Sequence, residues 1–195
     1  MSYVPFLKFK VNEVSALKAL SLIDRTRVTP FFDLPRQDNL NSSSLKNVID
    51  KAHRKYEINL TQLPYIYIDN FDIDDSILIN GYDNYTYVLE KFSDINIVPV
   101  VGIDRSEERN NAVINAKENE ALLLNTVALR VTSDDFISYS LIEDEIRDLF
   151  ESLDEYYEDY HLIIDNRITH NINATARASQ IINFINDITD DIDFD

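Results

Sequence analysis

Short apolar runs alternate with amphipathic segments six times along the chain, and this alternation constrains the fold more than any other feature. The runs are rich in β-branched and aromatic residues, which indicates strands at 3–9, 28–34, 65–69, 97–103, 126–131 and 161–165. The segments between them carry apolar residues at helical spacing, as Leu45, Ile49, Ala52 and Tyr56 do. We expect helices at about 12–22, 45–56, 85–92, 106–118, 138–156 and 181–188.

Repeated βα units predict the α/β class, with a mainly parallel sheet and right-handed crossovers. Two architectures fit: a TIM-barrel-like fold that is partial, with about six strands, or an open doubly wound parallel sheet. A full barrel needs eight units and about 250 residues, whereas this chain has 195. A barrel would therefore be partial, a fragment, or closed by a partner, so oligomerisation would complete the sheet or barrel.

No linker divides the chain, and we expect a single α/β domain over residues 1–195. Five aspartates fall in the last nine residues, so the acidic tail at about 187–195 is expected to be a frayed, solvated end. No run approaches the length of a membrane span, and the N-terminus is too short and charged for a signal peptide. The expected location is cytoplasmic, and no membrane contact is expected.

The charge is strongly negative, with 35 acidic and 18 basic residues and a net charge of −17. Such a surface repels phosphate backbones, so we expect no direct binding of nucleic acid. Three interpretations stay open: solubility alone, a basic protein partner, or an acidic mimic of nucleic acid.

Side chains alternate across a strand, so each expected strand has two faces. One face is entirely apolar and is expected to meet the helices. The other face carries a charged residue at or near the carboxyl end of the strand, where barrels and open α/β sheets place their sites. These ligand-binding candidates are Lys8, Lys10, Asp33, Asp69, Asp104, Arg130 and Asp165.

Each candidate also has a purely structural interpretation. An aspartate after a strand often begins a turn or caps the next helix. Lys8 and Arg130 lie within strands between apolar neighbours, so they indicate either a polar pocket or an internal salt bridge.

Several kinds of catalytic motif are absent. The chain has no cysteine, two glycines and three histidines, without the spacing of a zinc site, a phosphate-binding loop or a nucleophile elbow. Asp69, Asp104 and Asp165 are candidate ligands of Mg²⁺. Lys8 or Lys10 with Arg130 would instead bind an anionic or phosphorylated ligand. No catalytic residue is assigned, and no other cofactor is evident.

The opening YVPFLKFKVNEVSALKALSLIDRTRVTPFFDLPR, residues 3–36, resembles the beta protein family of bacteriophages and prophages. Members typically begin with a Pro-hydrophobic-Leu-Lys-x-Lys strand, then an acidic residue and an Ala-Leu helix, then a Thr-Pro strand that ends in an acidic residue and a proline. The matching positions are 5–10, Glu13, 16–17 and 29–35, and Asp33 stands where members more often have Glu. The segments NIVPVVGI, TVALRV and YHLIIDNR look like the middle of the family pattern.

This resemblance implies a barrel-like α/β fold and a setting among phage accessory genes, near toxic or anti-phage modules. Members are usually longer, so the chain is expected to correspond to the first half or more of one. The residues carried over as candidates are Lys8, Lys10, Glu13, Asp33, Arg130 and Asp165.

The function expected first is that of an accessory protein in host–phage conflict, as a defence or toxin-modulating component. It would bind a toxin or effector protein through the acidic surface, or an anionic ligand at the strand ends. The alternatives are a barrel enzyme that acts on phosphate esters with a divalent metal, and an acidic mimic of nucleic acid. Whether the protein is an enzyme stays open.

Overall fold

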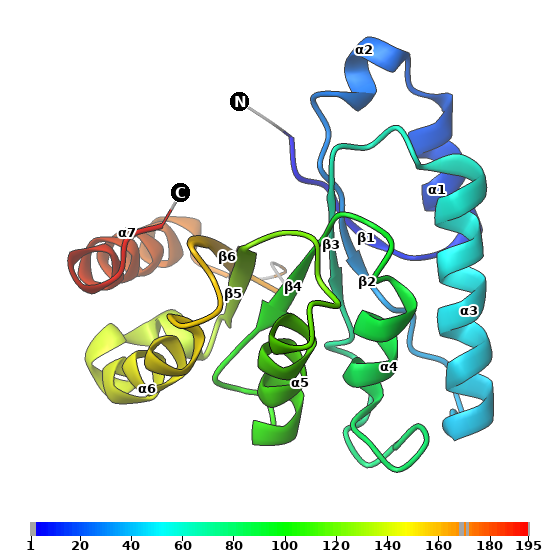
Figure 1. Ribbon diagram of the computed structural model, residues 1–195. Coiled ribbons are helices and arrows are strands. Elements are labelled where there is room, and N and C mark those ends of the chain that lie inside the picture. The colour runs from blue at the N-terminus through cyan, green and yellow to red at the C-terminus, as the bar shows by residue number, and fades with distance from the viewer. Residues whose placement is uncertain (1–2, 168–169, 171, 195) are drawn as a thin grey trace. The chain divides into compact units, whose positions relative to one another are not determined.

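Strands and helices alternate along the chain in a computed structural model that describes residues 3–167, 170 and 172–194 (Figure 1). The strands are β1 (Phe6–Lys8), β2 (Phe31–Asp33), β3 (Ile66–Asp69), β4 (Ile97–Val101), β5 (Thr126–Thr132) and β6 (Asp159–Asp165). The α-helices are α1 (Val11–Ala19), α2 (Leu22–Arg25), α3 (Ser42–Asn59), α4 (Asn84–Lys91), α5 (Glu107–Glu118), α6 (Glu143–Leu153) and α7 (Ala174–Asp191). Two 3₁₀ turns, η1 (Asp135–Ile137) and η2 (Tyr139–Leu141), precede α6. The predicted α/β class is confirmed.

The chain divides into two compact units. The first unit runs to Val100 and includes Ser106–Leu124, and the second comprises Val101–Arg105 and the chain from Asn125 onwards. The expected single domain over 1–195 stays a prediction.

The first unit is built on a parallel sheet in which β1, β2, β3 and β4 are neighbours in chain order. This order shows no reversal among these strands. It fits one wall of a TIM-barrel-like fold, and it also fits an open parallel sheet wound in one direction.

The two faces of this sheet agree with the alternation expected from the sequence. Leu7, Phe32 and Ile68 share one row of the register, and Phe9 stacks on Phe32 at 4.1 Å between ring centroids. Phe9 also contacts Phe92, at the end of α4, so this is the face that meets the helices.

The opposite face carries a ladder of aromatic rings. Phe6, Phe31 and Tyr67 share a row of the register, and their rings stack at 4.5 Å and 5.6 Å. Such stacked pairs stabilise adjacent strands beyond simple burial of area.

The helices of the first unit form a contiguous layer, since α1 contacts α3, α3 contacts α4, and α4 contacts α5. Helix α5 begins as expected, because the Ser106 hydroxyl accepts a hydrogen bond from the Arg109 backbone N–H at 3.3 Å. Helix α3 begins at Ser42, earlier than expected, and Asn41 caps it.

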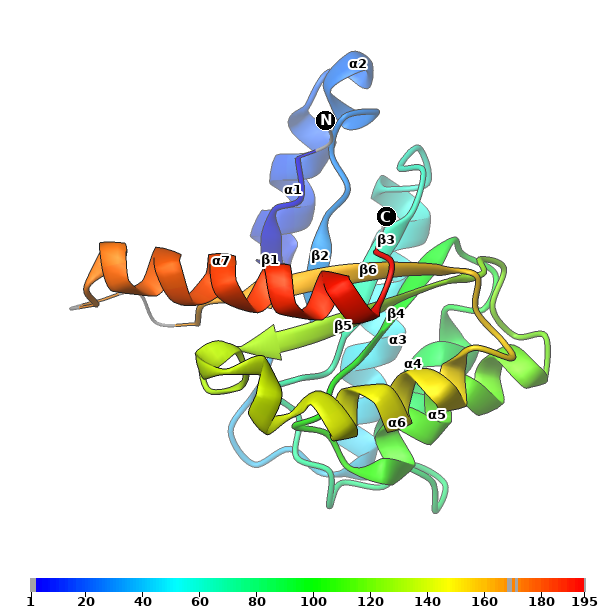
Figure 2. The ribbon, with the colours of Figure 1, turned by 90° about the vertical axis from the view of Figure 1, so that its left-hand side faces the viewer.

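The second unit contains the parallel pair β5–β6, with α6 and α7 alongside it (Figure 2). Its register runs from Thr126 opposite Asp159 to Thr132 opposite Asp165. Phe184 of α7 packs edge-on against Phe136 and Tyr139, at 6.4 Å and 5.9 Å between ring centroids. These aromatic contacts join α7 to the 3₁₀ turns.

Two helices begin or end at other residues than the sequence predicted. The helix expected at 12–22 ends at Ala19, because the Ser21 hydroxyl accepts from the Asp24 backbone N–H and starts the separate helix α2. The helix expected from about residue 138 starts at Glu143. Tyr139 is buried against Phe184, so the preceding segment follows tertiary packing in short 3₁₀ turns.

The expectation of a frayed acidic tail is wrong for residues 187–191, which belong to α7. Ile188 is fully buried, and Asp191 accepts hydrogen bonds from the Tyr139 hydroxyl at 2.8 Å and from Arg147 at 2.9 Å. These contacts hold the helix to the turns and to α6. Among the residues that the structure describes, no helix is both long and apolar enough to cross a bilayer.

Candidate functional site

A row of three charged residues crosses the first unit at the carboxyl ends of its strands. Lys8 lies opposite Asp33 in the register, and Asp33 lies opposite Asp69. Because the register keeps paired residues of parallel strands on one side, the row shares the face of the Phe6–Phe31–Tyr67 ladder. Asp69 is fully buried and Asp33 is 7% exposed. The row is the polar end of an otherwise aromatic face.

Lys8 is held by two carboxylates. Its ammonium lies 2.9 Å from Asp33 Oδ2, and it also donates to Asp72 Oδ2. Burial, the largest single influence, lowers the pKa of Lys8, but the Asp72 hydrogen bond and the Asp33 charge together outweigh it, so the pKa is raised. Lys8 thus makes an internal salt bridge, and its role in a ligand-binding pocket stays a prediction.

A hollow of about 460 Å³ adjoins this ion pair and shares Asp72 with it. The loops after β2 and β3 form its walls, with Arg36 and Asp74 among the charged residues. The Ser76 hydroxyl and backbone N–H both donate to Asp74, and these bonds lower the pKa of its carboxyl. The hollow therefore offers both signs of charge.

Buried polar contacts hold the loop after β3 in place. Arg109 of α5, 3% exposed, lies 2.5 Å from Asp75 Oδ1 and donates to the Ile73 carbonyl at 3.3 Å. The Asn84 side-chain amide donates to the carbonyls of Asp74 and Ile77. This loop is tied to α4 and α5, so the hollow has a supported wall.

Two predicted candidates lie away from the row. Lys10 is exposed and occupies the N-cap position of α1. Glu13 lies in the first turn of α1 and lines an apolar groove that includes Leu7 and Leu17. Since Leu7 is on the helix-facing side of β1, Glu13 and Lys8 lie on opposite sides of the sheet.

In the second unit, Arg130 and Asp165 form a buried ion pair. Arg130 is 1% exposed, and its Nε and Nη2 donate to Asp165 Oδ2 at 3.1 Å and 2.5 Å. Burial, the largest influence, raises the pKa of Asp165, but the hydrogen bonds from Arg130 and from the Arg167 backbone outweigh it and the pKa is lowered. Arg130 therefore makes an internal salt bridge, and its role as a ligand-binding residue stays a prediction.

Asp104 lies in the same unit, close to the backbone of Arg130. A Cβ at Gly102 would come within 2.8 Å of Asp104 Oδ1 and 3.1 Å of the Arg130 carbonyl oxygen, so any side chain there would force the Asp104 carboxylate and the Arg130 backbone to shift. Arg105 Nε is 3.7 Å from the Asp104 carboxylate. The expectation that Asp69, Asp104 and Asp165 hold Mg²⁺ stays a prediction.

A second polar hollow, which the sequence did not reveal, lies in the second unit. It measures about 480 Å³ and is bounded by α6, the start of β6 and the end of α7. We call it the acidic hollow; it is lined by Glu151, Asp154, Glu158, Asp159, Asp191 and Asp193, together with Arg147, Phe150, Tyr160 and Ile192. The only signals in the sequence were the acidic residues of 151–159 and of the tail, which are far apart along the chain.

The acidic hollow combines negative charge with aromatic rings. Phe150 and Tyr160 lie edge-on with 4.9 Å between centroids, and the Tyr160 hydroxyl donates to Asp154 at 2.7 Å. Its cation, Arg147, pairs with Asp191 at 2.9 Å and with Glu143 at 2.8 Å. Carboxylates beside ring faces are the groups that receive lysine and arginine side chains.

Comparisons with known proteins show one likeness. A model of the family described as Beta protein matches residues 3–195. No curated protein and no solved structure matches the chain. The match spans both units, with the charged row in the first and the Arg130–Asp165 pair in the second. The chain therefore belongs to the Beta protein family.

Proposed function

We propose that this protein is a phage-associated accessory component of host–phage conflict that acts by binding a basic protein partner, such as a toxin or effector. The observation that carries the proposal is the acidic hollow of the second unit. Membership of the Beta protein family supports the phage setting.

The distribution of charge supports a basic partner over an anionic ligand. The second unit holds 18 acidic and 5 basic residues, against 17 and 13 in the first unit. The two strand cations, the partly exposed Lys8 and the buried Arg130, are already paired with carboxylates. An anion would have to compete with these carboxylates, whereas a cation meets unneutralised charge in the second unit.

The groups that line the acidic hollow suit a basic side chain of a partner. Glu151, Glu158, Asp159 and Asp193 are exposed around it, and the half-buried Tyr160 supplies ring surface, while Phe150 is buried behind it. A lysine or arginine of a partner would gain ion pairs at the rim and contact with the Tyr160 ring. Such a pair at the rim would make association fast and sensitive to salt.

The test is affinity capture from a bacterial host that expresses the neighbouring phage genes, followed by titration with the purified captured protein. The acidic-hollow variant removes four exposed charges through Glu151→Gln, Glu158→Gln, Asp159→Asn and Asp193→Asn. The first-unit variant is its matched control and removes four exposed charges through Glu90→Gln, Glu107→Gln, Glu108→Gln and Glu118→Gln.

We expect one basic protein to be recovered by the wild type and by the first-unit variant, and to be lost with the acidic-hollow variant. Its affinity should fall as salt rises. Equal loss in both variants would indicate a general charge effect, and recovery of nothing with the neighbouring genes expressed would contradict the proposal. If duplex DNA displaces the captured protein, the acidic surface acts as a mimic of nucleic acid.

A further inference from the structure

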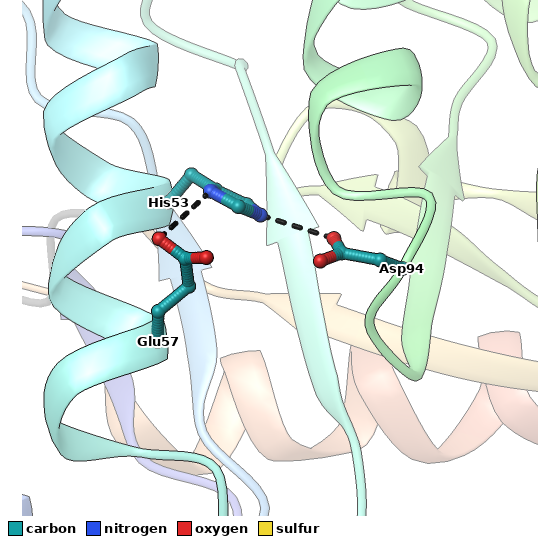
Figure 3. Close-up of side chains that lie close together, drawn as sticks. All are labelled: His53, Glu57 and Asp94. Carbon is teal, nitrogen blue, oxygen red and sulfur yellow. Dashed lines mark hydrogen bonds and ion pairs between the residues drawn. The ribbon is translucent and has the colours of Figure 1, made fainter.

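A histidine between two carboxylates lies in the first unit, apart from both hollows described above. His53 and Glu57 stand one turn apart on α3, and Asp94 lies in the turn between α4 and β4 (Figure 3). His53 Nε2 is 3.0 Å from Asp94 Oδ1, and Nδ1 is 3.5 Å from Glu57 Oε2. One ligand atom from each residue lies within 4.8 Å of the others.

We propose that His53, Glu57 and Asp94 form a binding site for a divalent transition-metal ion, with Zn²⁺ as the representative. Imidazole combined with carboxylate favours Zn²⁺ and its neighbours over the hard cations Mg²⁺ and Ca²⁺, which prefer oxygen ligands alone. Helical spacing of four residues places a histidine and a glutamate on one face, where both reach the same ion.

The spacing of the ligand atoms suits such an ion. With Zn–N and Zn–O bonds of about 2.0–2.2 Å, neighbouring ligand atoms stand about 3.0–3.5 Å apart. Each carboxylate already lies at such a distance from one ring nitrogen of His53, Asp94 from Nε2 and Glu57 from Nδ1. Only one ring nitrogen ligates an ion, so one carboxylate must move to reach it. The side chains of Glu57 and Asp94 are 53% and 64% exposed, which leaves both carboxylates free to move.

The surroundings hold the imidazole in position and leave the ion accessible. His53 is 9% exposed at its side chain and packs edge-on against Phe92, with 5.2 Å between ring centroids. A hollow of about 480 Å³ beside Glu57 and Asp94 leaves room for water to complete the coordination. The carboxylate that stays hydrogen-bonded to the other ring nitrogen would hold the imidazole in its orientation.

The experiment is calorimetric titration of the full chain, freed of metal, with Zn²⁺ alone. Co²⁺ serves as a second probe, because its visible absorption reports the number and geometry of its ligands. We expect one Zn²⁺ per chain in the wild type, at least about tenfold weaker binding in His53→Gln, and a loss of about tenfold in Asp94→Asn. His170→Gln, a change of an exposed histidine elsewhere, is the matched control and should bind as the wild type does.

Two results would overturn the proposal. One is the absence of a stoichiometric Zn²⁺ site in the wild type, which would mean that the cluster is an ion-paired histidine only. The other is binding that His53→Gln and Asp94→Asn leave unchanged, which would place the ion on the acidic surface. If His53→Gln does not fold by circular dichroism, the double variant Glu57→Gln, Asp94→Asn decides, because both side chains are exposed.

Discussion

Arg130 illustrates how burial decides the role of a charged residue within a strand. It is 1% exposed, and a guanidinium so placed costs several kcal/mol unless an anion accompanies it. Asp165, 35 residues later, supplies that anion from the neighbouring strand. The alternation of the sequence located both residues, but only the folded structure shows that they meet: Arg130 lies opposite Ile163, and its side chain reaches Asp165 two residues further along β6.

At the scale of the single residue, we predict that Asp165→Asn lowers the stability of the protein and changes how that stability depends on pH. The replacement removes a charged acceptor from Arg130, which costs roughly 1–3 kcal/mol at pH 7. The pKa of Asp165 is lowered in the folded state. Its contribution is therefore fully present above the unfolded value of about 3.9 and is lost as the pH falls through the lower folded value.

Urea unfolding at pH 7 and at pH 3 checks this prediction. The gap between the wild type and Asp165→Asn should be wide at pH 7 and narrower at pH 3, which lies below the unfolded pKa of about 3.9, so that the unfolded wild type takes up a proton. Asp134→Asn, at an exposed site in the same unit, should follow the wild type at both values. A gap that stays constant with pH would show that the charge of Asp165 is not what stabilises the fold.

Helix starts show how local chemistry sets the limits of an element. The Asn41 side chain accepts from the Ser44 backbone N–H at 3.0 Å, and the Ser44 hydroxyl accepts from the Asn41 N–H at 2.9 Å. This reciprocal capping satisfies two amides that the helix itself leaves unpaired. Helix α3 therefore begins at Ser42, three residues before the start expected from the apolar spacing.

At the scale of the element, we predict that Asn41→Ala destabilises the protein by about 1 kcal/mol, within the range of about 0.5–2 kcal/mol for lost caps. The measurement is chemical unfolding followed by circular dichroism. Ser43→Ala is the matched control, since Ser43 is exposed in the first turn of α3 and alanine favours helix. If both variants changed the free energy of unfolding equally, the Asn41 cap would not stabilise the protein.

Charge is divided unevenly over the whole molecule. The second unit has 18 acidic against 5 basic residues, so most of the net charge of −17 belongs to it. Like charges at this density repel one another and oppose the compact state. The same surplus favours a cationic partner, so a cost in stability accompanies the proposed binding role.

At this scale we predict that salt stabilises the protein chiefly by screening the second unit. Raising NaCl from about 0.01 M to about 1 M shortens the screening length from about 30 Å to about 3 Å, and the melting temperature of the wild type should rise. The acidic-hollow variant should melt higher than the wild type at low salt and respond less to added salt. The first-unit variant should keep the response of the wild type, and the same slope in all three proteins would contradict the prediction.

The sequence by itself determined the α/β class, the order of the elements and the two faces of the strands. Periodicity is a property of consecutive residues, so the period of two that puts Lys8, Asp33 and Asp69 on the face opposite Leu7, Phe32 and Ile68 can be read from the chain. The helix expected at about 106–118 is α5, which begins at Glu107 after its cap Ser106, and capping is likewise a property of neighbouring residues.

Only the tertiary structure decided which charged groups meet and where the acidic hollow lies. Asp72 pairs with Lys8 from 64 residues away, and the hollow joins residues of 147–160 to residues of 191–193. Lys10 and Glu13 follow the strand motif in the sequence, yet the turn into α1 carries them away from the charged row. These outcomes depend on strand register and helix packing, which couple residues distant in the chain and leave no local periodic signal.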